Sequence, residues 1–223
     1  MDTSFFESYK DPLDVNDHLF ALAIHDIEHD KVALSRLGIV KQKGTILVSR
    51  IIDGEHLWIK HRSDMMKCWR RYESQLQKLV EIEHKGIIVK TCATCFVCFF
   101  PEKSEKLCHS VTDAISVAFK IHKGLRSDDP IQIGDSTDTL KVKIAICYGP
   151  CYKRSVHVQK RTLADYCGGI MDEAYRALEC FDQSNELPPD SLDGLVIVKS
   201  EYLDTPPIGK PEWIHVDRAI VNI

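Results

Sequence analysis

The sequence predicts an α+β fold of the ferredoxin-like, split βαβ type. Segments with strand-like and helix-like patterns follow one another in the order β-α-(hairpin)-α-β-β-α-β-α-β. Two neighbouring strand segments, 87–91 and 95–101, lie between two amphipathic helical segments, which is typical of a split βαβ core. The 223 residues, 44% of them hydrophobic, are enough for one large domain with a full core.

The first third of the chain is predicted to form a strand, a short helix and a hairpin. After a polar lead-in, residues 18–25 are rich in Leu, Phe and Ile and predict a buried strand. Residues 31–37 predict a short helix, which a glycine ends. Residues 45–52 are a β-branched run, and the Asp-Gly pair at 53–54 leads to a second segment at 55–60. This pattern predicts a β-hairpin.

The middle of the chain carries the clearest helix, predicted at residues 64–83. Its apolar residues recur every three or four positions and therefore share one face. They are Met65, Trp69, Tyr72, Leu76 and Leu79. Residues 87–91 and 95–101 follow as two strands with a tight connection, and residues 104–121 predict a second amphipathic helix.

The last part of the chain alternates loops with regular elements. Residues 126–139 are polar and predict a loop, whereas residues 140–148 alternate between apolar and polar positions and predict a strand ended by Gly149 and Pro150. The remaining predicted elements are a loop with Lys153, Arg154, Lys160 and Arg161, a helix at 169–181, a strand at 194–200 and an edge strand at 213–221.

Composition and charge exclude some classes of protein. The net charge of −4 and pI near 6.2 do not indicate a nucleic-acid partner. The longest strongly apolar run, 95–100, is far too short to span a bilayer, so we expect no membrane segment. The N-terminus lacks the basic and apolar regions of a signal peptide, and nine cysteines is an odd number. We therefore expect reduced thiols and a cytoplasmic location.

Three of the cysteines, Cys92, Cys95 and Cys98, have the spacing Cys-x-x-Cys-x-x-Cys. That spacing is found in zinc and iron–sulfur sites. The alternative is that Cys98, which lies inside an apolar strand, is a small buried hydrophobic residue. We favour the second interpretation and keep the metal site as a hypothesis.

Four segments, taken in order, resemble the class III adenylyl/guanylyl cyclase homology domain over residues 18–203. Asp26-Ile27-Glu28 is similar to the end of the family's first strand, and 90–96 is similar to its catalytic hairpin, Lys-Thr-x-Gly-Asp-Gly-Phe. Residues 143–149 resemble the strand Arg-Ile-Gly-Ile-His-Thr-Gly, and 165–176 resemble the last catalytic helix. The resemblance implies the class III cyclase fold, with 1–17 and 204–223 as extensions.

The resemblance implies a damaged metal site. In the family, two Asp residues hold two metal ions on a nucleoside triphosphate, and the site lies at a dimer interface. Asp26 matches the first of them, although it also fits the cap of a following helix. Thr94 occupies the second position, and a hydroxyl is a poor Mg²⁺ ligand compared with a carboxylate. The phosphate-binding turn is replaced by His29-Asp30-Lys31, which lacks the family's glycine.

The nucleotide-binding positions of the implied site match the family's residues better than the metal-binding positions do. Lys90 and Asp165 match the pair that selects adenine, and Arg176 matches the arginine that stabilises the transition state. Asp172 replaces an Asn that orients the ribose and would repel a triphosphate. From the residues alone, Lys90 also fits an ordinary surface lysine, and Asp172 with Arg176 fits a helical i, i+4 ion pair.

These observations predict a catalytically degenerate cyclase-homology domain with a structural, regulatory or nucleotide-sensing role in a larger assembly. The alternative is a half-site subunit that makes cAMP and pyrophosphate from ATP when a partner supplies the metal-binding carboxylates. We expect a homodimer, or a heterodimer with another such domain, and Mg or Mn only where nucleotide binds. Residues 41–62 have no counterpart in the family's minimal domain and are predicted to be an inserted hairpin.

Overall fold

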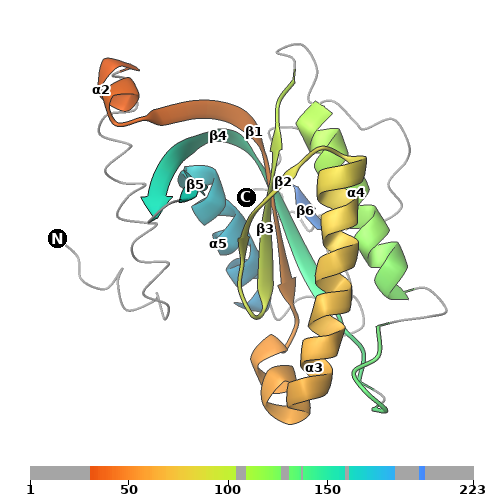
Figure 1. Cartoon of the computed structure of the whole chain (residues 1–223). Helices are drawn as coiled ribbons and strands as arrows, with labels where there is room; N and C mark the ends of the chain where they lie inside the picture. Colours follow the sequence, from red (N-terminus) through yellow and green to blue (C-terminus); the bar gives the residue numbers. More distant parts are fainter. Residues whose placement is uncertain are drawn as a thin grey trace.

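The computed structural model describes residues 31–103, 109–126, 131–136, 138–158, 161–183 and 196–198. Its helices are α2 (Lys31–Arg36), α3 (Gly54–Gln77), the π-helical segment η2 (Lys78–Glu83), α4 (His109–Arg126) and α5 (Gly169–Gln183). Its strands are β1 (Ile39–Ile51), β2 (Ile87–Thr91), β3 (Cys95–Pro101), β4 (Val142–Val158), β5 (Arg161–Cys167) and β6 (Val196–Val198) (Figure 1).

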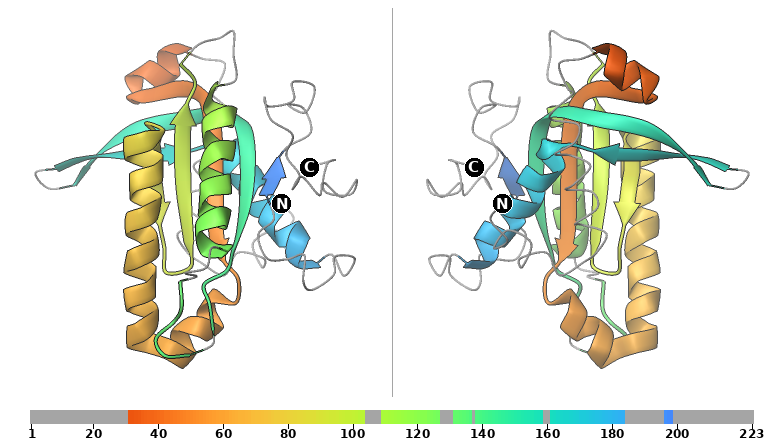
Figure 2. Two further views of the ribbon diagram at one scale, coloured as in Figure 1. Left: turned by 90° about the vertical axis from the view of Figure 1, so that its right-hand side faces the viewer. Right: turned by 90° about the vertical axis from the view of Figure 1, so that its left-hand side faces the viewer.

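One sheet with helices on both faces forms the body of the molecule. Its strand order is β2-β3-β1-β4-β5, all antiparallel, and β6 pairs with β4 in parallel. Helices α3 and α4 cover one face and α5 covers the other, as the two side views in Figure 2 show. The predicted α+β class is confirmed, and β2 and β3 do form the adjacent pair between two helices.

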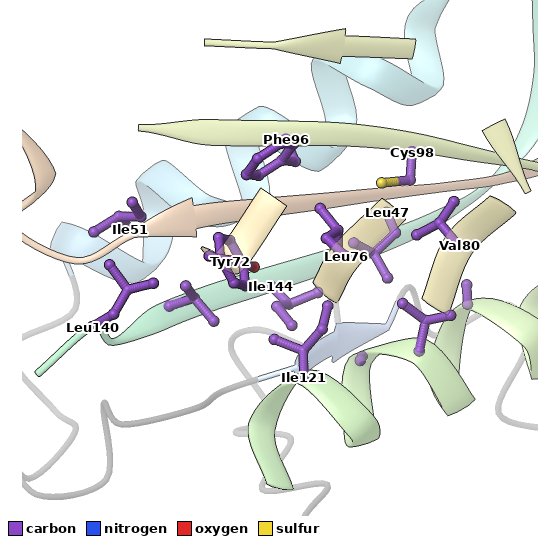
Figure 3. Packing of buried hydrophobic residues seen from close by; sticks show 14 of the residues in the cluster. Leu47, Ile51, Tyr72, Leu76, Val80, Phe96, Cys98, Ile121, Leu140 and Ile144 are labelled. Carbon is purple, nitrogen blue, oxygen red and sulfur yellow. The ribbon is translucent and has the colours of Figure 1, made fainter. Parts of the chain in front are cut away.

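The alternation of side chains along β1 explains the two cores. Leu47 and Ile51 point to the face that α3 and α4 cover, together with Phe96 and Ile144 (Figure 3). Ile46 and Val48 belong to the cluster beneath α5. Because both faces of the strand are buried, an unbroken apolar run is the pattern expected for it.

The prediction of an inserted hairpin at residues 41–62 is wrong. β1 lies in the middle of the sheet between β3 and β4. The turn at 53–54 exists, with Asp53 in the left-handed conformation at φ 53°, but residues 55–60 after it are helical. Glu55 in the first turn favours a helix start, and Leu57 packs against the core. Arg62, with φ 39° and ψ −101°, kinks α3 and separates this first part from the long amphipathic part.

The predicted loop after Gly149 and Pro150 is wrong as well. β4 continues to Val158 and pairs with β5 over residues 152–158. Proline has no N–H to donate, and a central strand uses its N–H groups to bond the strands on both of its sides. At Pro150, however, the described ladders pair β4 with β1 alone, since β6 pairs at 144–146 and β5 begins pairing at 152. The strand can therefore pass through this proline.

The other predicted elements fall into two groups. The helices near 31–37, 104–121 and 169–181 correspond to α2, α4 and α5 where the structure describes them. The predicted strands at 18–25 and 213–221, and the domain boundaries at 17 and 203, lie outside the described residues. Among the helices described, none has the length and apolar character needed to cross a bilayer.

Candidate functional site

The turn between β2 and β3 forms the centre of the candidate site. The Cys92 N–H donates to the Cys95 carbonyl at 2.9 Å, which closes the turn. The end of β1 lies against it, because the Ile51 N–H donates to the Thr94 carbonyl at 2.7 Å. Thr94, which sequence analysis placed at the second metal position, is therefore beside the last residues of the central strand.

Arg50 at this end of β1 is a residue that sequence analysis missed. The sheet register pairs Arg50 with Cys95 on β3 and with Lys143 on β4. The alternation that buries Ile46 under α5 places Arg50 on that same face. The charge of Arg50 acts on the Cys95 thiol and lowers its pKa, although larger effects oppose it. The signal in the sequence was an Arg near the end of an apolar strand, three residues before an Asp-Gly turn.

The first helical turn of α3 packs closely against the β2–β3 turn. A Cβ on Gly54 would lie 2.8 Å from the Thr94 Cγ2 atom, so a side chain there would force the two segments apart. The Trp58 indole N–H donates to the Ala93 carbonyl at 2.6 Å. The connection between the two strands is thus held by backbone bonds on one side and by α3 on the other.

Two cysteines bracket this connection. The Sγ atoms of Cys92 and Cys95 are 3.0 Å apart, and the Cys95 N–H donates to the Cys92 Sγ atom at 3.2 Å. The side-chain hydrogen bond between the two thiols lowers the pKa of Cys92 to about 5. The same bond, together with burial, raises the pKa of Cys95. Cys92 is exposed and Cys95 is buried, so the two thiols differ in access and in acidity.

Helix α5 approaches the same turn from the other face. The Tyr175 hydroxyl lies 3.8 Å from the Cys95 Sγ atom. Its neighbour Arg176 is exposed, and Asp172 is half-buried one turn earlier. Asp172 and Arg176 lie four residues apart on α5, and the i, i+4 ion pair between them stays a prediction.

The residues predicted to select adenine lie on different strands. Lys90 is half-buried on β2, immediately after the irregularity in its pairing with β3. Asp165 lies on β5, where the register places it opposite Arg154 of β4, and the two side chains form an ion pair. Asp165 therefore has a structural partner on the neighbouring strand.

The hypothesis of a three-cysteine metal site is wrong. Cys95 faces α5, whereas Cys98 lies in the cluster under α3 and α4, beside Leu76 and Val80 (Figure 3). Burial raises the pKa of the Cys98 thiol, as expected for a small hydrophobic residue. Within the described ranges, no three His, Cys, Asp or Glu side chains are grouped so that they could hold a metal ion. Asp26 lies outside those ranges.

A hollow of about 390 Å³ lies elsewhere, between α3 and residues 131–135. Charged side chains of both signs line it, among them Asp64, Lys67, Arg71 and Asp135. None of the residues that sequence analysis singled out lies in its lining. The candidate site is therefore the β2–β3 turn with its neighbours from β1, α3 and α5.

Comparison with known proteins identifies the fold. The structure is similar to the adenylyl cyclase CyaB from P. aeruginosa, with a TM-score of 0.59 and 18% identity over 73% of this chain and 79% of that one. The guanylyl cyclase Cya2 gives a TM-score of 0.61 and 16% identity over 75% and 79%. A class III adenylyl cyclase-like ATP-binding protein from Pseudomonas aeruginosa gives 0.53 and 16% over 72% and 34%.

No family model and no curated protein matches the chain. Identities this low carry information on the fold and none on activity. The chain therefore has the class III nucleotide cyclase fold, as the sequence motifs predicted.

Proposed function

We propose that this chain is a cyclase-fold domain without cyclase activity of its own, which acts as a structural, regulatory or nucleotide-sensing component of a larger intracellular assembly. One observation carries the proposal. The resemblance implies one metal-binding Asp at a strand end and a second in the hairpin. The strand end that lies against the hairpin turn is that of β1, where Arg50 pairs with Cys95. The hairpin itself carries Thr94.

A guanidinium at this position opposes metal binding. Two unit charges 4 Å apart interact by about 4 kcal/mol at an effective dielectric constant near 20, and a divalent cation doubles that repulsion. Thr94 beside it contributes a neutral hydroxyl, which does not offset the repulsion. Beside the hairpin turn, position 50 thus carries a cation and position 94 a neutral hydroxyl, and neither supplies a carboxylate that would hold a metal ion on a triphosphate. Asp26, which matched the first metal ligand, lies outside the described residues.

The surroundings of Asp165 support the same conclusion. In the family, an acidic residue at this place helps to select the base. Here Arg154 already engages the carboxylate across the β4–β5 ladder. A nucleotide would have to share Asp165 with that ion pair. Asp172 adds a second acidic group on α5, and like charge disfavours a triphosphate nearby.

The test is cAMP formation by the purified full chain with ATP and Mn²⁺ or Mg²⁺. We expect no cAMP above a protein-free background. Thr94→Asp alone should not restore strong activity, because Arg50 and Asp172 remain. Thr91→Asp, an exposed position on β2, is the matched control for added charge. Robust cAMP formation by the unmodified chain, abolished by Arg176→Ala, would rule the proposal out.

Calorimetry with ATP and GTP separates nucleotide sensing from the other two roles that the proposal leaves open. Binding of ATP without turnover, weakened by Lys90→Ala, would indicate nucleotide sensing. No binding of either nucleotide at millimolar concentration would indicate a structural or regulatory role.

A second candidate function rests on the exposure of Arg176 on α5. In a heterodimer with another cyclase-fold chain, an exposed arginine can act in a site whose metal carboxylates come from the partner. We would then expect cAMP only from the mixture, and its loss in Arg176→Ala but not in Glu173→Ala on the same helix. A mixture that stays inactive with cyclase-fold partners that carry both carboxylates would remove this candidate.

A further inference from the structure

The β2–β3 turn carries two thiols in an arrangement that the proposed function does not use. The Sγ atoms of Cys92 and Cys95 are 3.0 Å apart, and a disulfide needs about 2.05 Å, so only a small movement separates the dithiol from the bond. Two residues, Ala93 and Thr94, separate the two cysteines along the chain, and the turn that joins them is closed by a backbone hydrogen bond of 2.9 Å.

Access to the two sulfur atoms is strongly asymmetric. Cys92 is exposed, whereas Cys95 is only 6% exposed and lies beneath α5 near the Tyr175 hydroxyl. A reagent from solution therefore reaches Cys92 first. Cys95 is placed to react only with Cys92.

We infer that Cys92 and Cys95 form a thiol–disulfide exchange pair, in which Cys92 attacks a low-molecular-weight disulfide of the glutathione type and Cys95 resolves the product. This inference goes beyond the proposed function and does not depend on it. Polar contacts of the Cys92 sulfur with the Cys95 thiol, the Cys95 N–H and the Thr94 hydroxyl stabilise negative charge on that atom. The lowered pKa of Cys92 is consistent with these contacts.

The exchange proceeds in two balanced steps. The Cys92 thiolate attacks one sulfur of the disulfide, the S–S bond of the reagent breaks, and one thiolate leaves with its electron pair. The Cys95 thiol then loses its proton to solvent, attacks the Cys92 sulfur and expels the second thiolate. The protein dithiol is oxidised to a disulfide, and the reagent is reduced to two thiols. The hydrogen bond with Cys92 and burial raise the pKa of Cys95, and the charge of Arg50 works against that increase and so favours the second step.

The other described cysteines are unsuited to this reaction. Within the part of the chain that the structure describes, they are all buried, namely Cys68, Cys98, Cys147, Cys151 and Cys167. Burial raises the pKa of Cys68 to about 11 and that of Cys151 to about 12, so that both remain protonated at neutral pH. Selective reaction at Cys92 is the expected outcome.

The bond would also act on α3. Closing the gap between the sulfur atoms tightens the connection that contains Ala93, whose carbonyl accepts the Trp58 indole N–H. Trp58 is partly buried against the core, and its indole N–H bonds directly to this connection, so its fluorescence reports on a change there. We therefore expect a change in Trp fluorescence on oxidation, absent in Trp58→Phe.

The experiment uses the full chain in buffers of increasing ratio of oxidised to reduced glutathione, with rapid acid quenching, alkylation of free thiols and peptide mass spectrometry. In the unmodified chain, we expect Cys92 and Cys95 to lose reactivity together, with a two-hydrogen mass loss on their common peptide. Cys95→Ser should instead accumulate glutathione on Cys92. Cys92→Ser should slow modification of Cys95 at least tenfold. Cys68→Ser is the matched control and should behave as the unmodified chain.

Three results would overturn the inference: persistent glutathione on Cys92 in the unmodified chain, modification of Cys95 that is as fast in Cys92→Ser as in the unmodified chain, or alkylation of both thiols at every glutathione ratio. Circular dichroism of each variant shows whether the fold is retained. If a serine variant fails to fold, the mass loss on the unmodified chain and its reversal by dithiothreitol still decide the question.

Discussion

The hydroxyl groups of Ser49 and Tyr72 offer a sharp test of how the candidate site is supported. Ser49 precedes Arg50 on β1, and its Oγ atom lies 2.5 Å from the Tyr72 Oη atom of α3. Ser49 is 1% exposed and Tyr72 is 2% exposed. Burial raises the pKa of Tyr72, so the phenol stays protonated and the pair stays neutral. The bond therefore joins the central strand to α3 inside the apolar core.

The expected loss in the free energy of unfolding follows from the buried hydroxyl that each substitution leaves without its partner. Tyr72→Phe leaves the Ser49 hydroxyl buried without its partner, and Ser49→Ala leaves the Tyr72 hydroxyl in the same state. Each should lower the free energy of unfolding by about 1–3 kcal/mol. The double variant removes both polar groups and should cost clearly less than the sum, with a coupling energy of about 1–2 kcal/mol.

Urea unfolding followed by Trp fluorescence measures these energies, since the Trp69 ring centroid lies 6.2 Å from that of Tyr72. With a slope of about 2 kcal/mol per molar urea, each single variant should shift the midpoint by roughly 0.5–1.5 M without changing the slope. Additive losses in the double variant would refute the argument, because they would mean that the two hydroxyls do not depend on each other. Ile59→Ala, an exposed position on α3, is the control and should change stability by less than about 0.5 kcal/mol.

Two further predictions concern the sheet and its surface. Gly44→Ala should cost about 3 kcal/mol, or roughly 6–12 °C in melting temperature, because its Cβ would lie 2.3 Å from the Phe100 carbonyl oxygen. Gly169→Ala, which meets nothing within 4 Å, should melt within about 2 °C of the unmodified chain, and an equal effect of both would contradict the packing. Asp138 accepts hydrogen bonds from two basic side chains of α3, which lower its pKa from 3.8. The stabilising contribution of Asp138 is present above pH 3.8 and is lost as the pH falls through its lower pKa in the folded state. Asp138→Asn should therefore weaken the dependence of the melting temperature on pH below pH 3.8.

Much of the fold could be predicted from local patterns, and the errors have identifiable causes. The long helix and the β2–β3 pair follow from periodicity and a tight turn, which depend on residues close in the chain. The central position of β1 in the sheet does not follow from such local patterns. A β-branched run before an Asp-Gly turn is equally typical of a hairpin, and only pairing with β3 and β4, more than 40 residues away, distinguishes the two.

The candidate site was predicted in part. The hairpin with Thr94 and the helix with Arg176 were found from short motifs, and the structure places α5 against that hairpin through Tyr175 and Cys95. Arg50 was missed, because its importance comes from the register with Cys95 and not from any motif. The contact of Trp58 with Ala93 was missed for the same reason, since residues 55–60 were expected in a strand.

The bonds that hold the β2–β3 turn come mainly from the backbone. The turn is closed by the Cys92 N–H, and β1 is joined to it by the Ile51 N–H and the Thr94 carbonyl. These are backbone groups, and the close packing of Gly54 against Thr94 requires only a small residue. A carboxylate at position 50 or 94 contributes to none of these contacts. The backbone bonds that hold the turn are therefore compatible with the pair of thiols that it carries.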